Sequence, residues 1–317
     1  MKTYIPILYF GLLLGLSYQT IFSQVVRTRP TKETPTTTTG TRPPLVTAPA
    51  NVKIDTKPEA LSMVDLKNSG KPPVEILRYI LPSTPTRSPE SINSAVGALC
   101  SAGFNEVEIA TALKEEGITA SQATSSLKNA CTFSKNRILS AIYAYYFQYA
   151  PAKHGIVRVI RENYSTSPDE IAQSLKDIAQ LNTSDSIRDI IAILRASDLA
   201  QTPQEAGRLS AIIASSNRSS SLTITYFVNE LPRLYGTSSF TLENYADAFT
   251  AFGLNPDAIC HFAINTGLAR NFGADHVIVA AKMLKHLGVS REGCAEMLRR
   301  RGRTATEILN ALTTVYG

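Results

Sequence analysis

Residues 165–172, STSPDEIA, place two carboxylates beside three hydroxyl groups. These are the residue types of an acid–base pair with a nucleophile. Their spacing also fits a helix start, because Glu170 follows Ser167 by three residues with a proline between them. In such a capping box each side chain accepts a backbone N–H, and proline suits the first helical position. Similar starts recur at residues 202–205, 35 positions later, and at residues 255–258, which favours helix caps over a catalytic dyad.

Motifs of the common enzyme classes are missing from the sequence. It contains no GxSxG, HExxH, P-loop or GxGxxG pattern. His276 and His286 are ten residues apart, so they do not form an i, i+4 pair of metal ligands. Cys260 and His261 could form a thiol–imidazole pair, but adjacent residues of a helix point about 100° apart. We therefore expect no catalytic residue, no metal site and no cofactor.

An enzymatic alternative is a secreted hydrolase that acts on cell-wall or glycan polymers. Its acids would lie in a groove between helices, buried and outside the first turn of any helix, where acids serve as caps. Glu230 and Asp198 are the acids that best meet this condition, but no motif supports them.

The four cysteines form two pairs with similar spacing. Cys100 and Cys131 are 31 residues apart, and Cys260 and Cys294 are 34 apart. Both separations match two helices of the repeat described below, so each pair could form a disulfide between stacked helices. Four buried free thiols are the alternative. The spacing does not fit a zinc cluster of the CxxC type.

Two clusters of side chains could contact a partner. One is an arginine cluster at a helix end, where it could bind an anion or an acidic partner, or only complement the helix dipole. The other is an aromatic cluster, which could contact a protein or glycan, or belong to a central helix buried on two sides. The clusters consist of Arg299, Arg300, Arg301 and Arg303, and of Tyr143, Tyr145, Tyr146 and Tyr149.

The positive charge lies mainly outside the helical part of the chain. The net charge is +6, but residues 91–317 hold 21 Lys and Arg against 20 Asp and Glu. Residues 24–90 hold 10 against 6. A domain that neutralises many phosphates should carry the charge itself, so we expect no nucleic-acid partner.

The first 87 residues divide into three segments. Residues 1–23 carry one lysine and an apolar run of about a dozen residues, which indicates a secretory signal peptide without a lipobox cysteine. Residues 24–50 are rich in Thr and Pro and predict a disordered linker. Residues 51–87 predict an extended arm that packs on the domain, with one short helix at residues 74–81. No later apolar run reaches membrane length.

Residues 88–317 repeat one pattern. A cap residue precedes apolar positions at helical spacing, and glycine or a polar break follows. Starts fall about every 14–18 residues. Helices of three turns are not stable alone, so they must stack and share a core. The fold class is therefore all-α: an array of about twelve short helices stacked as antiparallel pairs, an α-solenoid or irregular superhelix. Residues 222–228, LTITYFV, alternate like a strand, but the whole stretch 221–236 is interpreted as a helix kinked at Pro232.

The pattern resembles that of secreted bacterial helical-repeat proteins with short LKxxG helices. The motif occurs in ALKEEG at residues 112–117 and MLKHLG at residues 283–288. The resemblance covers residues 88–317, implies a helical scaffold, and transfers no functional residue. We expect an exported non-enzymatic scaffold of the cell envelope or extracellular space that binds a protein or glycan. A structural surface-layer component is a further alternative.

Overall fold

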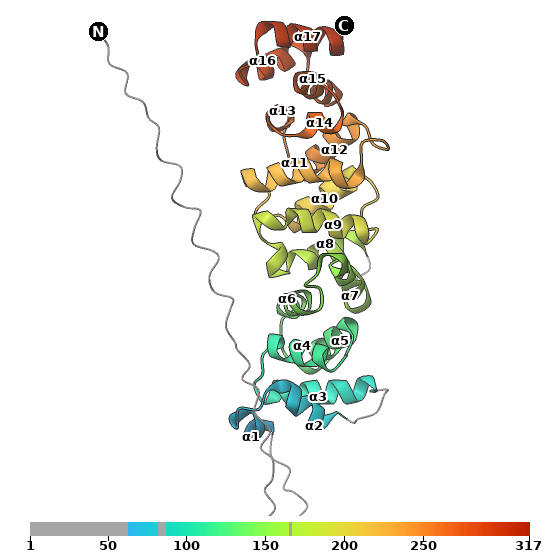
Figure 1. Ribbon diagram of the computed structural model, residues 1–317, viewed down its shortest axis with the longest axis vertical. Helices are drawn as coiled ribbons and strands as arrows, with labels where there is room; N and C mark the ends of the chain where they lie inside the picture. The colour runs from blue at the N-terminus through green and yellow to red at the C-terminus, as the bar shows by residue number, and fades with distance from the viewer. Residues whose placement is uncertain (1–62, 82–86, 165–166) are drawn as a thin grey trace, which may run out of the picture. The chain divides into compact units, whose positions relative to one another are not determined.

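The computed structural model describes residues 63–81, 87–164 and 167–317, all within the unit Pro58–Gly317. Regular structure in these residues is entirely helical (Figure 1). The seventeen α-helices of the described residues are α1 Met63–Asn68, α2 Pro73–Ile80, α3 Pro89–Ser101, α4 Glu106–Glu115, α5 Ala120–Ala130, α6 Lys135–Tyr146, α7 Gly155–Asn163, α8 Pro168–Lys176, α9 Ile187–Ala196, α10 Pro203–Ile213, α11 Ser221–Tyr235, α12 Leu242–Phe252, α13 Pro256–Asn265, α14 Leu268–Asn271, α15 His276–His286, α16 Arg291–Arg300 and α17 Ala305–Tyr316. The 3-10 helices are η1 Ala150–Ala152, η2 Ala179–Leu181 and η3 Ser184–Ser186. The expected signal peptide and linker lie outside the described residues.

The acids of STSPDEIA begin a helix. The Ser167 hydroxyl accepts the N–H of Glu170 at 3.3 Å, and the Glu170 carboxylate accepts the N–H of Ser167 at 3.4 Å. Hydrogen bonds from the Ser167 side chain and backbone lower the pKa of Glu170. Thr202 and Glu205 form the same reciprocal pair at α10. The capping interpretation is confirmed.

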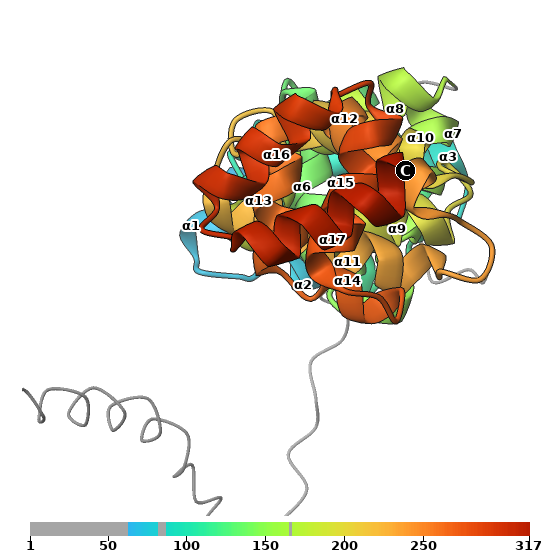
Figure 2. The ribbon, with the colours of Figure 1, turned by 90° about the horizontal axis from the view of Figure 1, so that it is seen from above.

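Helices stack on the second helix along the chain rather than mainly on the next one. One row runs through α2, α4, α6, α8, α10 and α12, and further contacts of the same kind join α3 to α5, α5 to α7 and α9 to α11. In Figure 1 the layers follow each other in chain order, and in Figure 2 α16 and α17 cover the earlier helices. This is the expected all-α array, in which each layer buries the apolar face of its neighbour.

The described residues hold more helices than the twelve or so expected. α7 has no side-chain cap at its start, and α14 has only four residues, so neither matches the cap-and-stripe pattern. Before Ser88 the described residues contain α1, which was not expected, and α2, which matches the short helix expected at residues 74–81. α1 and α2 occupy parts of the expected extended arm, and α2 stacks on α4 with Ile76 and Leu77 buried. The strand-like residues 222–228 lie in a helix, as expected, and α11 contains Pro232 in its last turn.

The closest stacking is between α10 and α12. Gly207 of α10 faces the carbonyl oxygen of Ala248 in α12, and a Cβ at position 207 would collide with that oxygen. Next to this contact Phe227 stacks on Phe252 with ring centroids 4.0 Å apart, and Phe249 meets Phe227 edge-on at 6.0 Å. Glycine is therefore required here by the approach of two backbones, and the aromatic rings fill the adjoining core.

Four lysines join neighbouring layers of the stack through the same kind of hydrogen bond. Each lies in the last turn of a helix and donates to a carbonyl at the carboxyl end of the second helix along. A cation suits this position because the helix dipole is negative there. The pairs are Lys67 with Gly103, Lys114 with Tyr145, Lys128 with Asn163 and Lys285 with Val315.

These lysine hydrogen bonds give a physical reason for the recurrence of the LK motif at helix ends. The leucine of each motif is fully buried, as in Leu113 and Leu284, whereas the lysine that follows reaches the neighbouring layer. Lys285 also lies over the ring of Tyr316 at 5.4 Å. The motif therefore serves packing between layers. None of the described helices is both long enough and apolar enough to cross a membrane.

Candidate functional site

An open groove of about 360 Å³ lies along the stack at α4, α6 and η2. One face of α6 forms its floor, because the lining positions 136–137, 140–141 and 144–145 recur at the spacing of a helix turn. The intervening positions of α6 face the core. The groove is lined by Glu106, Val107, Asn136, Arg137, Ser140, Ala141, Ala144, Tyr145, Asp177, Ala179 and Gln180.

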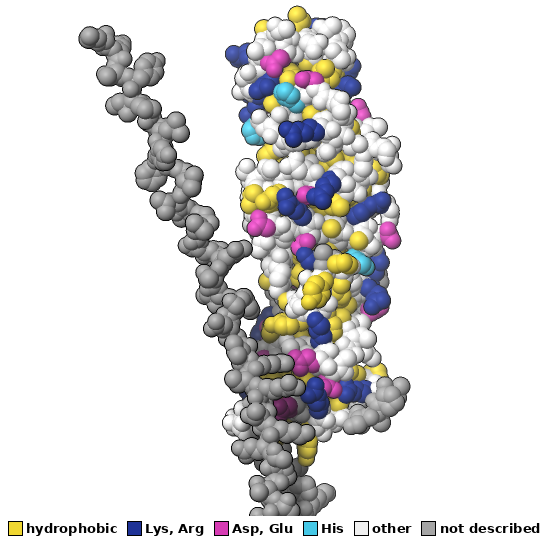
Figure 3. Space-filling view, viewed as in Figure 1, with side chains coloured by type: hydrophobic (Ala, Val, Ile, Leu, Met, Phe, Trp, Pro, Cys, Tyr) yellow, Lys and Arg dark blue, Asp and Glu magenta, His cyan; other side chains and the backbone are white. Residues whose placement is uncertain are grey.

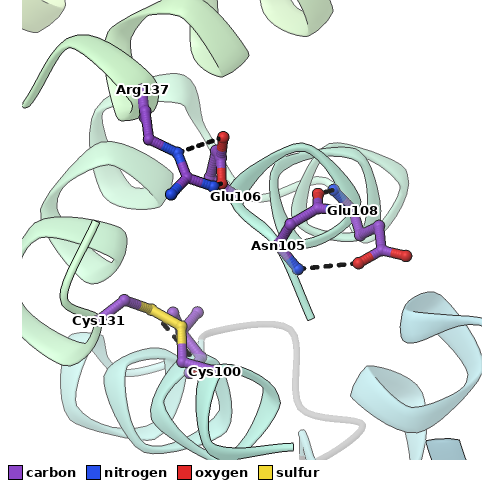
Figure 4. The surroundings of a disulfide bond; sticks show 7 residues. Cys100, Asn105, Glu106, Glu108, Cys131 and Arg137 are labelled. Carbon is purple, nitrogen blue, oxygen red and sulfur yellow. Dashed lines mark hydrogen bonds and ion pairs between the residues drawn. A yellow bond between two sulfur atoms is a disulfide. The ribbon is translucent and has the colours of Figure 1, made fainter. Parts of the chain in front are cut away.

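An ion pair joins α4 to α6 in this groove. Arg137 donates to both carboxylate oxygens of Glu106, at 2.9 Å from Nε and 2.5 Å from Nη2 (Figure 4). Burial of Glu106 acts to raise its pKa, but the hydrogen bonds and charge of Arg137 outweigh this and leave the pKa lowered. Glu106 is therefore an ionised carboxylate that holds two helices together and a poor proton donor.

The opposite edge of the groove is attached to α6 by Ser140. Its hydroxyl accepts the N–H of Ala179 at 2.8 Å and donates to the carbonyl oxygen of Asp177 at 3.4 Å. The Asp177 carboxylate lies 3.9 Å from the ammonium of Lys135 and is 39% exposed. The edge that carries Asp177 and Gln180 is therefore positioned by a hydroxyl in the middle of α6.

The aromatic cluster expected from the sequence is divided between the core and the surface. Tyr143 is buried, and burial raises the pKa of both Tyr143 and Tyr146. Tyr145 lines the groove, and Tyr149 is 76% exposed. The four tyrosines thus do not form one contact surface, because α6 packs against several neighbours and uses two of them for the core.

Sequence reasoning found Tyr145 but missed the rest of the groove. The available signal was the 31-residue separation of Glu106 and Arg137, which matches the repeat. The polar stripe of α6 beside its core stripe was a second signal. Neither identifies a groove without the position of η2, which follows α8 in the chain.

The arginine cluster does not present four free cations. Arg299 and Arg300 share the carboxylate of Glu296, at 2.9 and 3.0 Å. Arg301 pairs with Asp257 of α13, and Arg303 contacts His276 at 3.2 Å. Each guanidinium has an acidic or imidazole partner within the protein. An anion site at this cluster stays a prediction.

Only one of the two cysteine pairs is bonded. Cys100 and Cys131 form a disulfide between α3 and the end of α5, with Cα atoms 5.9 Å apart (Figure 4). Cys260 and Cys294 are buried free thiols, so the second disulfide expected from the sequence is wrong. Burial, followed by the charge of the other thiol, raises the pKa of Cys260 to about 12. Cys260 is therefore a protonated core residue and not an activated nucleophile.

The remaining acids considered for catalysis have structural partners. Glu230 is buried and pairs with Arg188 and Arg233, each at 3.2 Å. Asp198 is exposed in a left-handed turn, φ 54°, and accepts from the Gln201 amide at 3.0 Å. Within the described ranges no three His, Cys, Asp or Glu side chains converge as a metal site requires.

Charged side chains are mixed along the face shown in Figure 3, where basic and acidic groups lie near each other at several levels of the stack. No extended surface of one sign is visible on that face. Comparisons of the chain with known protein families, with curated proteins and with solved structures found no match.

Proposed function

We propose that the protein is an exported, non-enzymatic helical scaffold that binds a macromolecular partner through the groove at α4, α6 and η2. The partner belongs to the cell envelope or the extracellular space. The observation that carries this proposal is the groove itself, where a polar stripe of α6 is left open beside two neighbouring layers. Helical arrays generally bind their partners along such extended surfaces.

Two features support export. Residues 1–23 have the pattern of a secretory signal peptide. The disulfide between Cys100 and Cys131 suits a compartment that is oxidising. Both agree with a partner that is met outside the cytosol.

The binding proposal is tested by affinity capture from envelope preparations of the producing cells, with the mature secreted chain as bait. The test variant combines Tyr145→Ala with Gln180→Ala, which removes the half-buried tyrosine ring and the exposed amide of the groove. The partner captured by the native chain should be lost from this variant. Thermal unfolding of both proteins would show whether the variant retains its fold.

The matched control is Tyr149→Ala, which removes an equally large aromatic side chain that lies outside the groove lining. This control should retain the partner. Equal retention by the groove variant and the control would contradict the proposed site. Hydrolysis of envelope glycans by the native chain would contradict the non-enzymatic scaffold.

A further inference from the structure

The charged groups of the groove are largely satisfied by one another. Arg137 donates hydrogen bonds from two nitrogen atoms to the Glu106 carboxylate, and Lys135 lies near Asp177. The groove therefore offers no unpaired charge of one sign to a strongly charged ligand. A nucleic acid or an acidic polymer would meet two carboxylates, and a basic segment would have to displace Arg137 from Glu106.

Several neutral polar groups of the groove have no hydrogen-bond partner within the part of the protein that the structure describes. Among the described residues, the Tyr145 hydroxyl and the Gln180 amide have no protein partner. The Nδ2 group of Asn136 is also free, because the hydrogen bonds of this side chain are made by its Oδ1 atom. Together they supply donors and acceptors at three points of one groove.

The floor between these groups is formed by small side chains. It consists of Ala141 and Ala144, and Val107 is exposed at the side. Peptide partners generally owe their affinity to large side chains inserted in deep apolar pockets. Small alanines offer no such pocket, but they allow a flat ligand to approach the helix backbone and leave the Tyr145 ring and the Val107 side chain as the larger apolar surfaces of the groove.

We infer that the occupant of the groove is a neutral oligosaccharide. A sugar ring has one apolar face that packs on an aromatic ring and a rim of uncharged hydroxyl groups that donate and accept hydrogen bonds. Tyr145 supplies the ring, Asn136 and Gln180 supply amides, and the Asp177 carboxylate accepts from hydroxyl groups. The volume of about 360 Å³ is at the lower end for ligand pockets and accommodates a short stretch of a chain. This inference rests on the proposed function, because it identifies the chemistry of the partner in the same groove.

The experiment is saturation-transfer NMR and calorimetry with the full secreted chain. The probes are neutral tetrasaccharides of the cello, chito, malto and manno series, with a heparin tetrasaccharide as the charged comparison. At least one neutral probe should bind, and the heparin probe should not. Tyr145→Ala should weaken that binding by about tenfold or more. Tyr145→Phe, which keeps the ring, should weaken it less, and Tyr149→Ala should leave it unchanged.

The outcomes separate this inference from the function on which it rests. If no neutral tetrasaccharide binds while the groove variant still loses its envelope partner, the scaffold stands and the occupant is a protein, which overturns the saccharide. If neither sugar binding nor partner capture depends on Tyr145, both proposals fail. Equal weakening by Tyr145→Ala and Tyr149→Ala would also overturn the inference, because it would place the sugar away from the groove.

Discussion

The two cysteine pairs have similar separations but different states, and the difference comes from the stacking around them. Cys100 and Cys131 lie at α3 and the end of α5, which stack directly, and their Cα atoms are within the range that a disulfide spans. Cys260 and Cys294 lie on α13 and α16, but α13 stacks mainly on α15. The short α14 lies between α13 and α15 in the chain, so that α16 is the third helix after α13 and not the second. Equal spacing along the chain therefore does not produce equal neighbours.

The residues around the two cysteine pairs also differ. Burial raises the pKa of Cys294 against the opposing effect of the nearby Tyr316 hydroxyl, which donates to the Val289 carbonyl at 2.9 Å, and Cys260 has Arg301 nearby. Both thiols are at 0% exposure, so each fills core volume in the carboxyl-terminal layers (α10–α17). The amino-terminal layers (α2–α7) are instead joined by a covalent link and by the Glu106–Arg137 pair. Both regions bury an apolar core, and the amino-terminal layers carry a covalent cross-link in addition.

Removing the cross-link should give the largest loss of stability. The double variant Cys100→Ala with Cys131→Ala opens a loop of about 30 residues, and the free energy of unfolding should fall by about 3–4 kcal/mol because the unfolded chain regains entropy. Urea unfolding measures this loss. The double variant Cys260→Ala with Cys294→Ala is the control and should lose less, since no covalent link is broken. An equal loss in both would contradict the contrast between the regions.

Close packing in the carboxyl-terminal layers is tested at Gly207. The Gly207→Ala change should lower the free energy of unfolding by about 1–3 kcal/mol, because the added methyl group collides with the Ala248 carbonyl. Gly97→Ala in α3 is the matched control, since its nearest atom would be the Cβ of Ala130 at 3.7 Å. That change should stabilise by about 0.5–1 kcal/mol through better helix propensity. Thermal or urea unfolding that shows no difference between the two variants would argue against the tight α10–α12 contact.

The free thiols should make the protein less stable at alkaline pH. The folded pKa of Cys260 is raised to about 12, so above about pH 9 the unfolded chain loses this proton and the folded chain does not. Below about pH 9 the thiol is protonated in both states and does not reduce the free energy of unfolding. Between about pH 9 and 12 the free energy of unfolding falls, and it should be about 1 kcal/mol lower at pH 10 than at pH 8. Urea unfolding at both values measures the change. Cys260→Ser should show a smaller fall with pH, and an identical fall would mean that the thiol titrates normally in the fold.

Helix caps should contribute the smallest effect, because a capping bond is local and is made by one turn of one helix. Ser167→Ala removes the hydroxyl that accepts the Glu170 N–H and should cost about 0.5–1 kcal/mol. Ser134 precedes α6 but forms no side-chain cap, so Ser134→Ala should cost less. Unfolding measurements compare the two variants, and partner binding by the Ser167 variant should be unchanged. Loss of binding without loss of stability would give the acids of this segment a role beyond capping.

The fold could be predicted from the sequence because its determinants are local. Ser167 with Glu170 and Thr202 with Glu205 mark helix starts whatever surrounds them, since capping bonds close within one turn. α14 was missed because four residues carry no periodic pattern. The groove could be predicted only in part. Tyr145 stood out by type, but its neighbours at η2 come from another layer.

The sequence by itself determined most of the helices, their repeat and the pairing distance of about two helices, because capping and apolar periodicity act over short stretches of chain. Only the tertiary structure decided which cysteines bond, which tyrosines are buried and where a groove remains open. These outcomes depend on the register between layers, which arises from all the side chains packed between them. Tyr143 and Tyr145 are two positions apart on one helix, yet one fills the core and the other lines the groove.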